Sequence, residues 1–196
     1  MKRLVIATGN SGKVREIRAI LKHHYDEILS MKEAGVYADV VEDANTFEGN
    51  ARKKAVEISL LADCDVLADD SGLCVEGLGG RPGVYSARYS EAGTDEENNK
   101  KLVREVSALS EEDRKAHYAC AIVLARSGSV LFTGEATCDG VMVTQPRGEG
   151  GFGYDPYFFL PEYGKTMAEI SAEFKNQISH RARALELVEK YLEENA

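Results

Sequence analysis

One stretch of the chain limits the fold more than any other, because it places two acidic residues directly after an apolar run. The run Val66-Leu67-Ala68 is typical of a buried strand, and it leads into Asp69-Asp70-Ser71-Gly72-Leu73. Burial of an unpaired carboxylate is costly, and successive side chains of a strand point to opposite faces. At most one of the two acids can therefore face a given cleft, and the other needs hydrogen-bond donors elsewhere. The alternative is a simple turn at Ser71-Gly72, in which an Asp caps backbone amides.

The length and composition of the chain favour a single soluble domain, residues 1–196, with room for two lobes. The net charge of -9 argues against an extended basic face for DNA or RNA, although a few converging cations could still hold a small anion. No apolar run approaches the ~20 residues that span a bilayer, and the first residues lack the apolar core of a signal peptide. We expect a cytoplasmic protein that binds neither nucleic acid nor membrane.

The cysteines indicate neither a zinc site nor a redox pair. They show no Cys-x-x-Cys spacing and no paired His at ligand distance: Cys64, Cys74, Cys120 and Cys138. We expect reduced thiols, buried by default.

A glycine-bearing loop near the N-terminus is a candidate anion site. A β-prone run at 4–7 precedes it, and a helix with an apolar stripe follows it. Backbone amides at a helix N-terminus attract anions, and the lysine of the loop adds a full charge. It is not a Walker motif, because Ala7 and Val14 stand where that motif needs Gly and Ser or Thr. A plain β-to-α connection with a solvated lysine is the alternative. The loop consists of Thr8, Gly9, Asn10, Ser11, Gly12 and Lys13.

Residues 26–62 predict two strands, at 26–31 and weakly at 38–41, followed by a helix. Asn45 and Glu48 have the spacing of a capping box, and the helix has an apolar stripe of Ala51, Ala55, Ile58 and Ala62. Asn50 and Lys54 share another face of this helix, so both could reach into a cleft, although such residues usually face water.

The second half of the chain contains two glycine-rich loops. Residues 76–89 carry arginines and tyrosines without regular structure, which is typical of lids and binding loops. Residues 148–156 place Phe152 between glycines, which suits either a ring that lies flat on another ring or a core Phe at a tight turn. Between them we expect a helix capped by Thr94, an antiparallel hairpin of 118–125 with 130–133, and a strand at 141–144.

Three side chains with hydrogen-bond donors gather near the start of the last helix, which we expect Ser179 to cap. They are Lys175, His180 and Arg181, and cations are electrostatically disfavoured at a helix N-terminus. A purely structural chain has little use for this placement, although for Lys175 an exposed basic turn is the alternative. Acids without His or Cys suit a hard cation such as Mg2+ that is shared with substrate phosphates. A phosphate loop, such a cation and a stacking ring together describe a nucleotide site.

The sequence resembles the inosine triphosphate pyrophosphatase family, whose members hydrolyse ITP, dITP and XTP to the monophosphate and pyrophosphate. The resemblance covers nearly the whole chain, in motifs that follow one another in order: Thr8-Gly9-Asn10 with Lys13, Thr46-Phe47 with Asn50-Ala51 and Lys54-Ala55, Ala68 to Leu73, Gly79-Gly80 through Pro82-Gly83 to Arg88, Gly151 to Pro156, and Ser179-His180-Arg181. It implies a homodimer with an α/β fold. An elongated mixed β-sheet would be flanked by helices, and two lobes would enclose a central active-site cleft, as in Maf-like proteins.

The resemblance also implies a role for each site residue. The phosphates would be held by Thr8, Gly9, Asn10, Ser11, Gly12, Lys13, Lys54 and Ser71. One or more Mg2+ ions per subunit would be bound by Glu42 and Asp70, with Asp70 also the general base and Asp69 supporting the site from behind. Phe152 would stack on the base, and the other residues that bind substrate around it would be Gly153, Tyr154, Asp155, Lys175, His180 and Arg181.

The expected reaction is attack of water at the α-phosphorus, with pyrophosphate as leaving group. His180 and Arg181 as donors would accept the C6 oxygen of hypoxanthine and xanthine and disfavour adenine. No residue is assigned to the exclusion of guanine. Two alternatives remain open, a nucleotide-binding sensor without hydrolysis and a Maf-type pyrophosphatase acting on pyrimidine nucleotides. The Ser-His-Arg and Phe-Gly-Tyr-Asp segments favour the inosine type.

Overall fold

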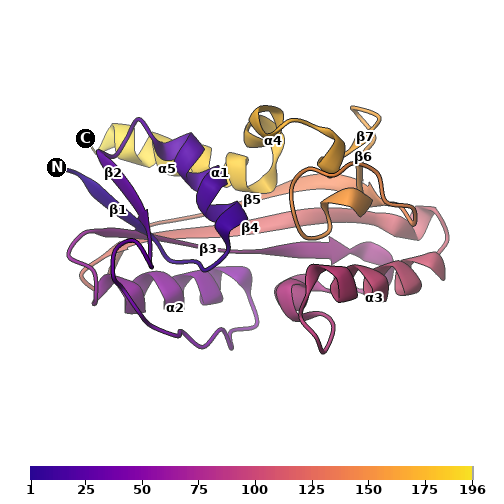
Figure 1. Ribbon diagram of the computed structural model, residues 1–196, viewed down its shortest axis with the longest axis horizontal. Helices are drawn as coiled ribbons and strands as arrows, with labels where there is room; N and C mark the ends of the chain where they lie inside the picture. Colours follow the sequence, from indigo (N-terminus) through magenta and orange to yellow (C-terminus); the bar gives the residue numbers. More distant parts are fainter. Residues whose placement is uncertain (196) are drawn as a thin grey trace. The chain divides into compact units, whose positions relative to one another are not determined.

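The computed structural model describes residues 1–195, which form two compact units (Figure 1). The first unit comprises Met1–Asp70, Cys120–Ala136 and the chain from His180 onward. The second comprises Ser71–Ala119 and Thr137–Ser179. The chain passes from one unit to the other within three of its strands.

Within residues 1–195, seven strands form one mixed sheet in the order β2-β1-β3-β4-β5-β6-β7. β1 pairs in parallel with β2 and β3, whereas β6 pairs antiparallel with β5 and β7. The strands are β1 (Arg3–Ile6), β2 (Glu27–Ser30), β3 (Asp65–Val75), β4 (Lys115–Arg126), β5 (Ser129–Met142), β6 (Phe158–Leu160) and β7 (Lys165–Thr166). The prediction of an α/β fold with a mixed sheet flanked by helices is confirmed.

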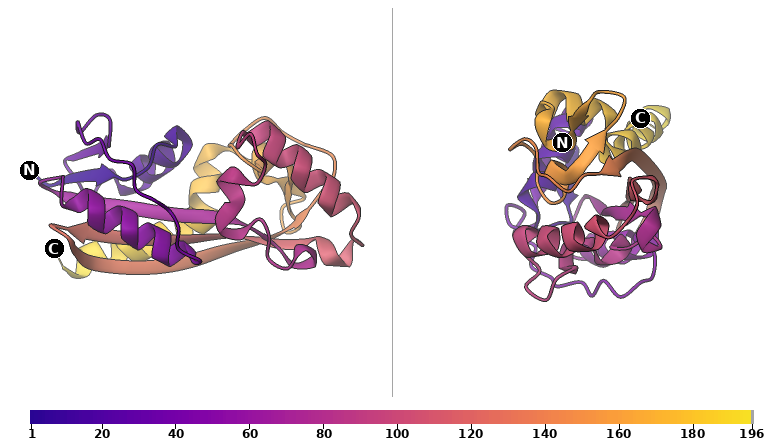
Figure 2. Two further views of the ribbon diagram at one scale, coloured as in Figure 1. Left: turned by 90° about the horizontal axis from the view of Figure 1, so that it is seen from below. Right: turned by 90° about the vertical axis from the view of Figure 1, so that its right-hand side faces the viewer.

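In the first unit, helices cover both faces of the strands (Figures 1 and 2). The helices are α1 (Ser11–Leu21), α2 (Phe47–Ser59) and α5 (His180–Glu194). Leu4 and Ile6 of β1 pack with apolar residues of α1 and α5, whereas Val5 packs with those of α2. This alternation follows from the two-residue period of a strand, and it buries Leu4, Val5 and Ile6, whereas Arg3 is exposed.

The second unit has its own apolar core. Its helices are α3 (Asp95–Ser107) and α4 (Ala172–Ile178), and short 3-10 turns connect several of its segments. Leu102 and Val106 of α3 pack in one cluster with Leu73 of β3 and Phe158 of β6. Thr94 caps α3 by accepting a hydrogen bond from the Glu97 amide, as its position predicts.

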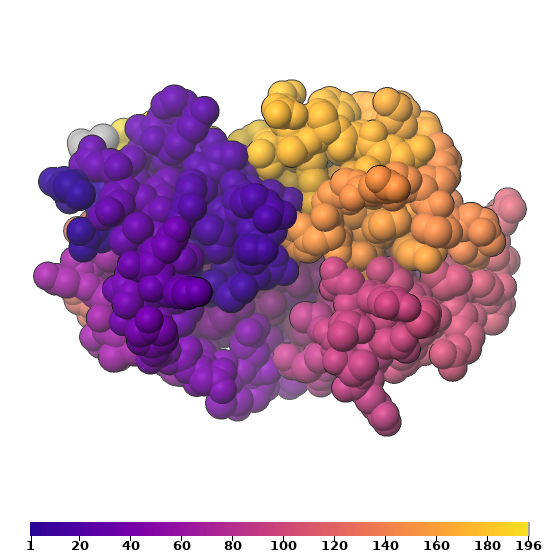
Figure 3. Space-filling view, viewed as in Figure 1, coloured from indigo at the N-terminus to yellow at the C-terminus, as the bar shows by residue number. Residues whose placement is uncertain are grey.

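Two predictions for the first half of the chain were wrong, and one alternative is excluded. Residues 38–41 form no strand in the described chain. They belong to an irregular segment on the surface of the first unit, in which Tyr37 is 80% exposed and Val41 is 66% exposed (Figure 3). Thr46, rather than Asn45, caps α2, since its hydroxyl oxygen accepts a hydrogen bond from the Gly49 amide. β3 does not turn at Ser71-Gly72 but continues to Val75.

Two predictions for the second half also need correction. The loop at 76–89 contains two 3-10 helices, Glu76–Leu78 and Gly83–Arg88. Residues 141–144 are not a separate strand, because β5 extends without a break from the hairpin turn at Ser127-Gly128 to Met142.

All four cysteines are free, and Cys64 and Cys74 are only partly buried. No helix within residues 1–195 is long and apolar enough to cross a membrane.

Substitution of Gly140 by alanine is a test of how tightly β5 and β6 pack. A Cβ atom at this position would lie 2.6 Å from the buried Phe158 ring and 2.6 Å from the Phe159 carbonyl oxygen, which cannot move away independently. We expect Gly140→Ala to lower the free energy of unfolding by about 2 kcal/mol. The matched control is Gly134→Ala in the same strand, where the added methyl meets only side chains of Phe132 and Leu187. Equal urea midpoints for the two variants would contradict the packing described.

Candidate functional site

Asp69 lies in the part of β3 that belongs to the first unit, and it is fully buried. Its Oδ2 lies 3.1 Å from Lys13 Nζ and accepts hydrogen bonds from Arg181 Nε and Nη2 at 3.2 and 3.1 Å. Burial alone would raise the pKa of Asp69, but the charges of Lys13, Arg181 and Lys54 outweigh it and hold the pKa below its usual range. The side chain is therefore a carboxylate, and it is neutralised by cations from α1, α2 and α5.

Arg181 is buried between α1 and β3. Its Nη1 is bound by Glu16 of α1, while Nε and Nη2 are bound by Asp69. Burial by itself would lower the pKa of Arg181. The carboxylates of Asp69 and Glu16 outweigh this effect and raise the pKa above its usual value, so the guanidinium stays charged. These contacts give Arg181 a task in the first unit that the sequence did not indicate, and its role toward the base stays a prediction.

Asp70 points to the opposite face of β3, as the alternation of side chains in a strand requires. Its Oδ2 accepts a hydrogen bond from Asn50 Nδ2 of α2 at 3.0 Å. Burial raises the pKa of Asp70 and the charge of Glu42 adds to this effect, while Lys54 and Asn50 act against it. Two acids that are adjacent in sequence thus have pKa values shifted in opposite directions.

Lys54 connects the two sides of this cluster. Its Nζ donates to the main-chain oxygen of Asp69 at 2.8 Å and lies 3.1 Å from a carboxylate oxygen of Glu42. Asn50 and Lys54 are four residues apart in α2, and both are buried on the face that the sequence analysis singled out.

The loop before α1 is arranged by Asn10. Its Oδ1 accepts hydrogen bonds from the amides of Gly12 and Lys13, so the Asn10 side chain caps α1 and these two amides are already bonded. The Lys13 ammonium and the hydroxyls of Thr8 and Ser11 are further polar groups of this loop. Thr8, Gly9 and Ser11 also line a pocket of about 930 Å³ in the first unit.

The acids of the first unit fit a hard divalent cation. Glu42 and Asp70 offer oxygen donors only, and the charge of Glu42 acts on Asp70. Among residues 1–195, no three His, Cys, Asp or Glu side chains are grouped to hold a metal ion by themselves. An ion held here would need further ligands from water and substrate phosphates, which is the way in which Mg2+ is commonly bound.

In the second unit, Asp155 holds the predicted base-binding residues together. Its Oδ2 lies 2.7 Å from Lys175 Nζ and 3.1 Å from the Phe152 amide, and its Oδ1 accepts from the Tyr118 hydroxyl at 2.9 Å. Lys175 Nζ also lies 4.5 Å from the centroid of the Phe152 ring, over one face of it. Tyr154 is buried beside them, and its hydroxyl donates to the Ser86 carbonyl at 2.6 Å.

The structure thus divides the predicted site residues between its two units. The first unit brings together the charged residues Lys13, Glu42, Lys54, Asp69, Asp70 and Arg181. The second brings together Phe152, Gly153, Tyr154, Asp155 and Lys175, and Ser71 belongs to it as well. His180 is buried at the start of α5, in the first unit.

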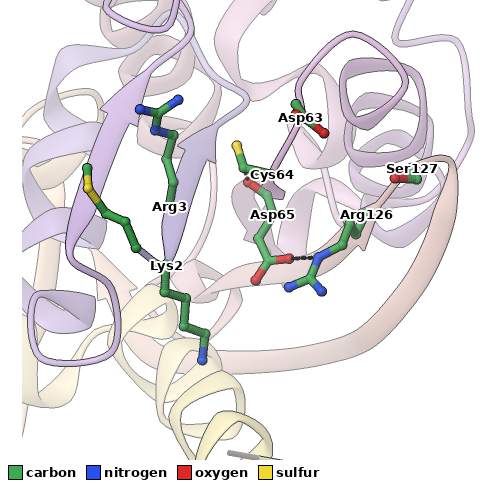
Figure 4. A pocket seen from close by; sticks show the side chains of 8 residues that line it. Lys2, Arg3, Asp63, Cys64, Asp65, Arg126 and Ser127 are labelled. Carbon is green, nitrogen blue, oxygen red and sulfur yellow. Dashed lines mark hydrogen bonds and ion pairs between the residues drawn. The ribbon is translucent and has the colours of Figure 1, made fainter.

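A separate hollow of about 540 Å³ lies at the amino ends of β1 and β3 (Figure 4). Its described lining includes no predicted site residue. The buried carboxylate of Asp65 is already bound there by Arg126 Nε at 2.6 Å and by the Tyr25 hydroxyl at 3.0 Å. This arrangement has the character of a structural ion pair.

Comparison with known proteins identifies the family. The family model described as Ham1 family matches residues 4–191. The chain belongs to the Ham1 family. This finding confirms the resemblance that the sequence motifs carry.

Relatives and solved structures of the Ham1 family match over the full length. A dITP/XTP pyrophosphatase of Geobacillus kaustophilus is 50% identical, over 99% of this chain and 96% of the relative. One from Bacillus subtilis is 43% identical, over 98% of both chains. The structure of the Staphylococcus aureus Ham1 protein, 38% identical, aligns over 100% of both chains with a TM-score of 0.86. A HAM1 protein from Coxiella burnetii, 35% identical, aligns over 99% of this chain and 100% of its own with a TM-score of 0.88.

Two residues of this Ham1 family chain that bind predicted site residues were missed in the sequence analysis. Glu16 binds Arg181, and Tyr118 binds Asp155. Glu16 lies three residues after Lys13 in α1, and this helical spacing was the available signal that both could serve one site. Tyr118 lies in an apolar strand pattern, which marked it as a core residue. Its hydroxyl needs a partner when buried, and Asp155 supplies it.

We expect Asp69→Asn to destabilise the first unit strongly. The variant would leave the buried Arg181 and the partly buried Lys13 without the charge that they share, and a broken buried ion pair costs about 3 kcal/mol or more. Urea unfolding at pH 7 measures the loss. The matched control is Asp43→Asn, which removes an exposed pair with Lys53 and should change stability little. Similar midpoints for the two variants would show that the Asp69 cluster is not a source of stability.

Proposed function

We propose that this chain hydrolyses purine nucleoside triphosphates with non-standard bases, ITP, dITP and XTP, to the monophosphate and pyrophosphate. The observation that carries the proposal is the cluster of Lys13, Lys54 and Arg181 around the buried acids Asp69 and Asp70. The name dITP/XTP pyrophosphatase of the full-length relatives supports the same substrate class.

The charged residues of the first unit would act on the triphosphate. Lys13 and Lys54 already lie beside carboxylates, so their ammonium groups are held in place before substrate arrives. Asp70 would accept the proton of the attacking water, since its raised pKa brings its basicity closer to that of a general base at neutral pH. Asn50 would orient this carboxylate through the hydrogen bond to Oδ2.

Glu42 and Asp70 would hold Mg2+ as the resident cation. When bound, the ion supplies neutralisation of the triphosphate charge and activation of water. Lys54, which contacts Glu42, would keep that carboxylate in position.

Phe152 and its neighbours in the second unit would bind the base. The ring offers a stacking surface, and Lys175 is a donor for the C6 oxygen that hypoxanthine and xanthine share. Adenine carries an amino donor at C6, so a buried donor facing it would remain unpaired. His180 and Arg181 stay proposed donors for the same oxygen.

The proposed enzyme is a cytoplasmic homodimer that binds neither nucleic acid nor membrane. The family resemblance supports the dimer, and the net charge of -9 supports the absence of a nucleic-acid partner. Light scattering on the purified chain measures its mass in solution.

We expect Asp70→Asn to lower kcat for dITP by a factor of about 100 or more, because the amide cannot take up a proton. Pyrophosphate and orthophosphate are measured separately for dITP, XTP, dGTP and dATP. Wild type should release pyrophosphate from dITP and XTP in preference to dATP and dGTP, and Asp43→Asn should match wild type. Tight binding of dITP without turnover in wild type would instead favour a nucleotide sensor. Orthophosphate as the product would place the attack at a terminal phosphate.

We expect chelation to remove the activity reversibly. EDTA should abolish release of pyrophosphate from dITP, and excess Mg2+ should restore it, because the protein supplies only oxygen ligands that bind hard cations. Glu42→Gln should raise the Mg2+ concentration needed for half-maximal rate about tenfold, whereas Glu48→Gln in α2 should not. Full activity after exhaustive chelation would contradict the assignment of Glu42 and Asp70.

A further inference from the structure

Gly153 lies in the loop that carries Phe152 and Tyr154. It has a φ of +62°, a left-handed conformation that other residues rarely adopt. A Cβ atom added there would meet nothing within 4 Å, so side-chain packing does not hold this residue. Its position must therefore be determined by its backbone hydrogen bonds.

Both polar backbone groups of Gly153 are bound by α3. The Gly153 amide donates to Asp95 Oδ2 at 2.9 Å, and Asn99 Nδ2 donates to the Gly153 carbonyl at 2.9 Å. Asp95 and Asn99 are four residues apart, so they lie on one face of the helix. Because a carbonyl oxygen can only accept a hydrogen bond, the Nδ2 side of the Asn99 amide must face Gly153.

These two bonds act on the neighbouring aromatic residues. The Gly153 amide belongs to the rigid peptide plane shared with Phe152, and the Gly153 carbonyl belongs to the plane shared with Tyr154. The preceding plane is held as well, because the Phe152 amide donates to Asp155 Oδ2 at 3.1 Å. With Asp95 in place, the peptide planes on both sides of Phe152 are determined.

We propose that Asp95 and Asn99, the α3 pair, are positioning residues that set the orientation of the Phe152 ring and thereby the selection of the base. The inference rests on the proposed function for its consequence, but not for its structural content. Loss of either bond frees one peptide plane beside Gly153, and the ring then samples orientations unsuited to stacking. Binding of the base would weaken, whereas the phosphate chemistry of the first unit would not change.

The test compares Asp95→Ala and Asn99→Asp with two controls. Asp95→Asn keeps an oxygen acceptor for the Gly153 amide and should rescue the wild-type behaviour. Glu96→Ala removes the same charge from the first turn of α3, yet Glu96 pairs with exposed Lys100 rather than with Gly153. Asp95 is exposed, so its replacement leaves the core intact if Asn99→Asp does not fold.

Two readouts are measured on the full chain. The first is steady-state kinetics with dITP, where loss of one bond should raise KM about tenfold and leave kcat within about threefold. The second is acrylamide quenching of a Phe152→Trp reporter, which is specific because the chain contains no tryptophan. Quenching should increase in the Asp95→Ala and Asn99→Asp backgrounds, and it should stay at the reference value in both controls.

Unchanged KM and unchanged quenching in Asp95→Ala would overturn the proposal. An equal effect of Glu96→Ala would also overturn it, because the cause would then be the helix charge. If wild type releases no pyrophosphate from dITP, the proposed function is wrong, but the proposal for the α3 pair is not thereby overturned. The quenching experiment still decides whether the α3 pair positions the ring.

Discussion

The carboxylate of Asp69 is the interaction on which the first unit depends. It is fully buried, and its Oδ2 is shared by Lys13 from the start of α1 and Arg181 from the start of α5. A charge in this position is stable only while its partners remain in contact, so the carboxylate ties both helix starts to β3. Cations near the first turn of a helix are unfavourable by themselves, and the buried acid offsets that cost.

This arrangement places the adjacent acids Asp69 and Asp70 in different environments. Asp69 faces α1 and α5 and is held as a carboxylate by surrounding cations, whereas Asp70 faces α2 and has its pKa raised by burial. Since a strand alternates its side chains, one residue can stabilise the fold while the next remains available to react. Lys54 belongs to both environments, because it contacts the main chain of Asp69 and the carboxylate of Glu42.

Local patterns in the sequence were sufficient for part of this picture. The shared face of Asn50 and Lys54 follows from helical spacing, and the burial of β1 follows from its apolar run. The contact between Glu16 and Arg181 could not be predicted, because 165 residues separate them and no local pattern records the pair. The alternative of a turn at Ser71-Gly72 is excluded for a related reason. β3 continues through its acids because distant helices supply the donors that the strand itself lacks.

The charge balance of the cluster around Asp69 and Asp70 is a physical argument for the proposed divalent cation. Glu16, Glu42, Asp69 and Asp70 contribute four negative charges, and Lys13, Lys54 and Arg181 contribute three positive ones. The cluster therefore has no surplus of positive charge with which to attract a triphosphate. A polyanion would have to compete with carboxylates that are already paired, and an accompanying cation removes that conflict. The same acids that stabilise the cations in the absence of ligand would thus make nucleotide binding depend on the metal.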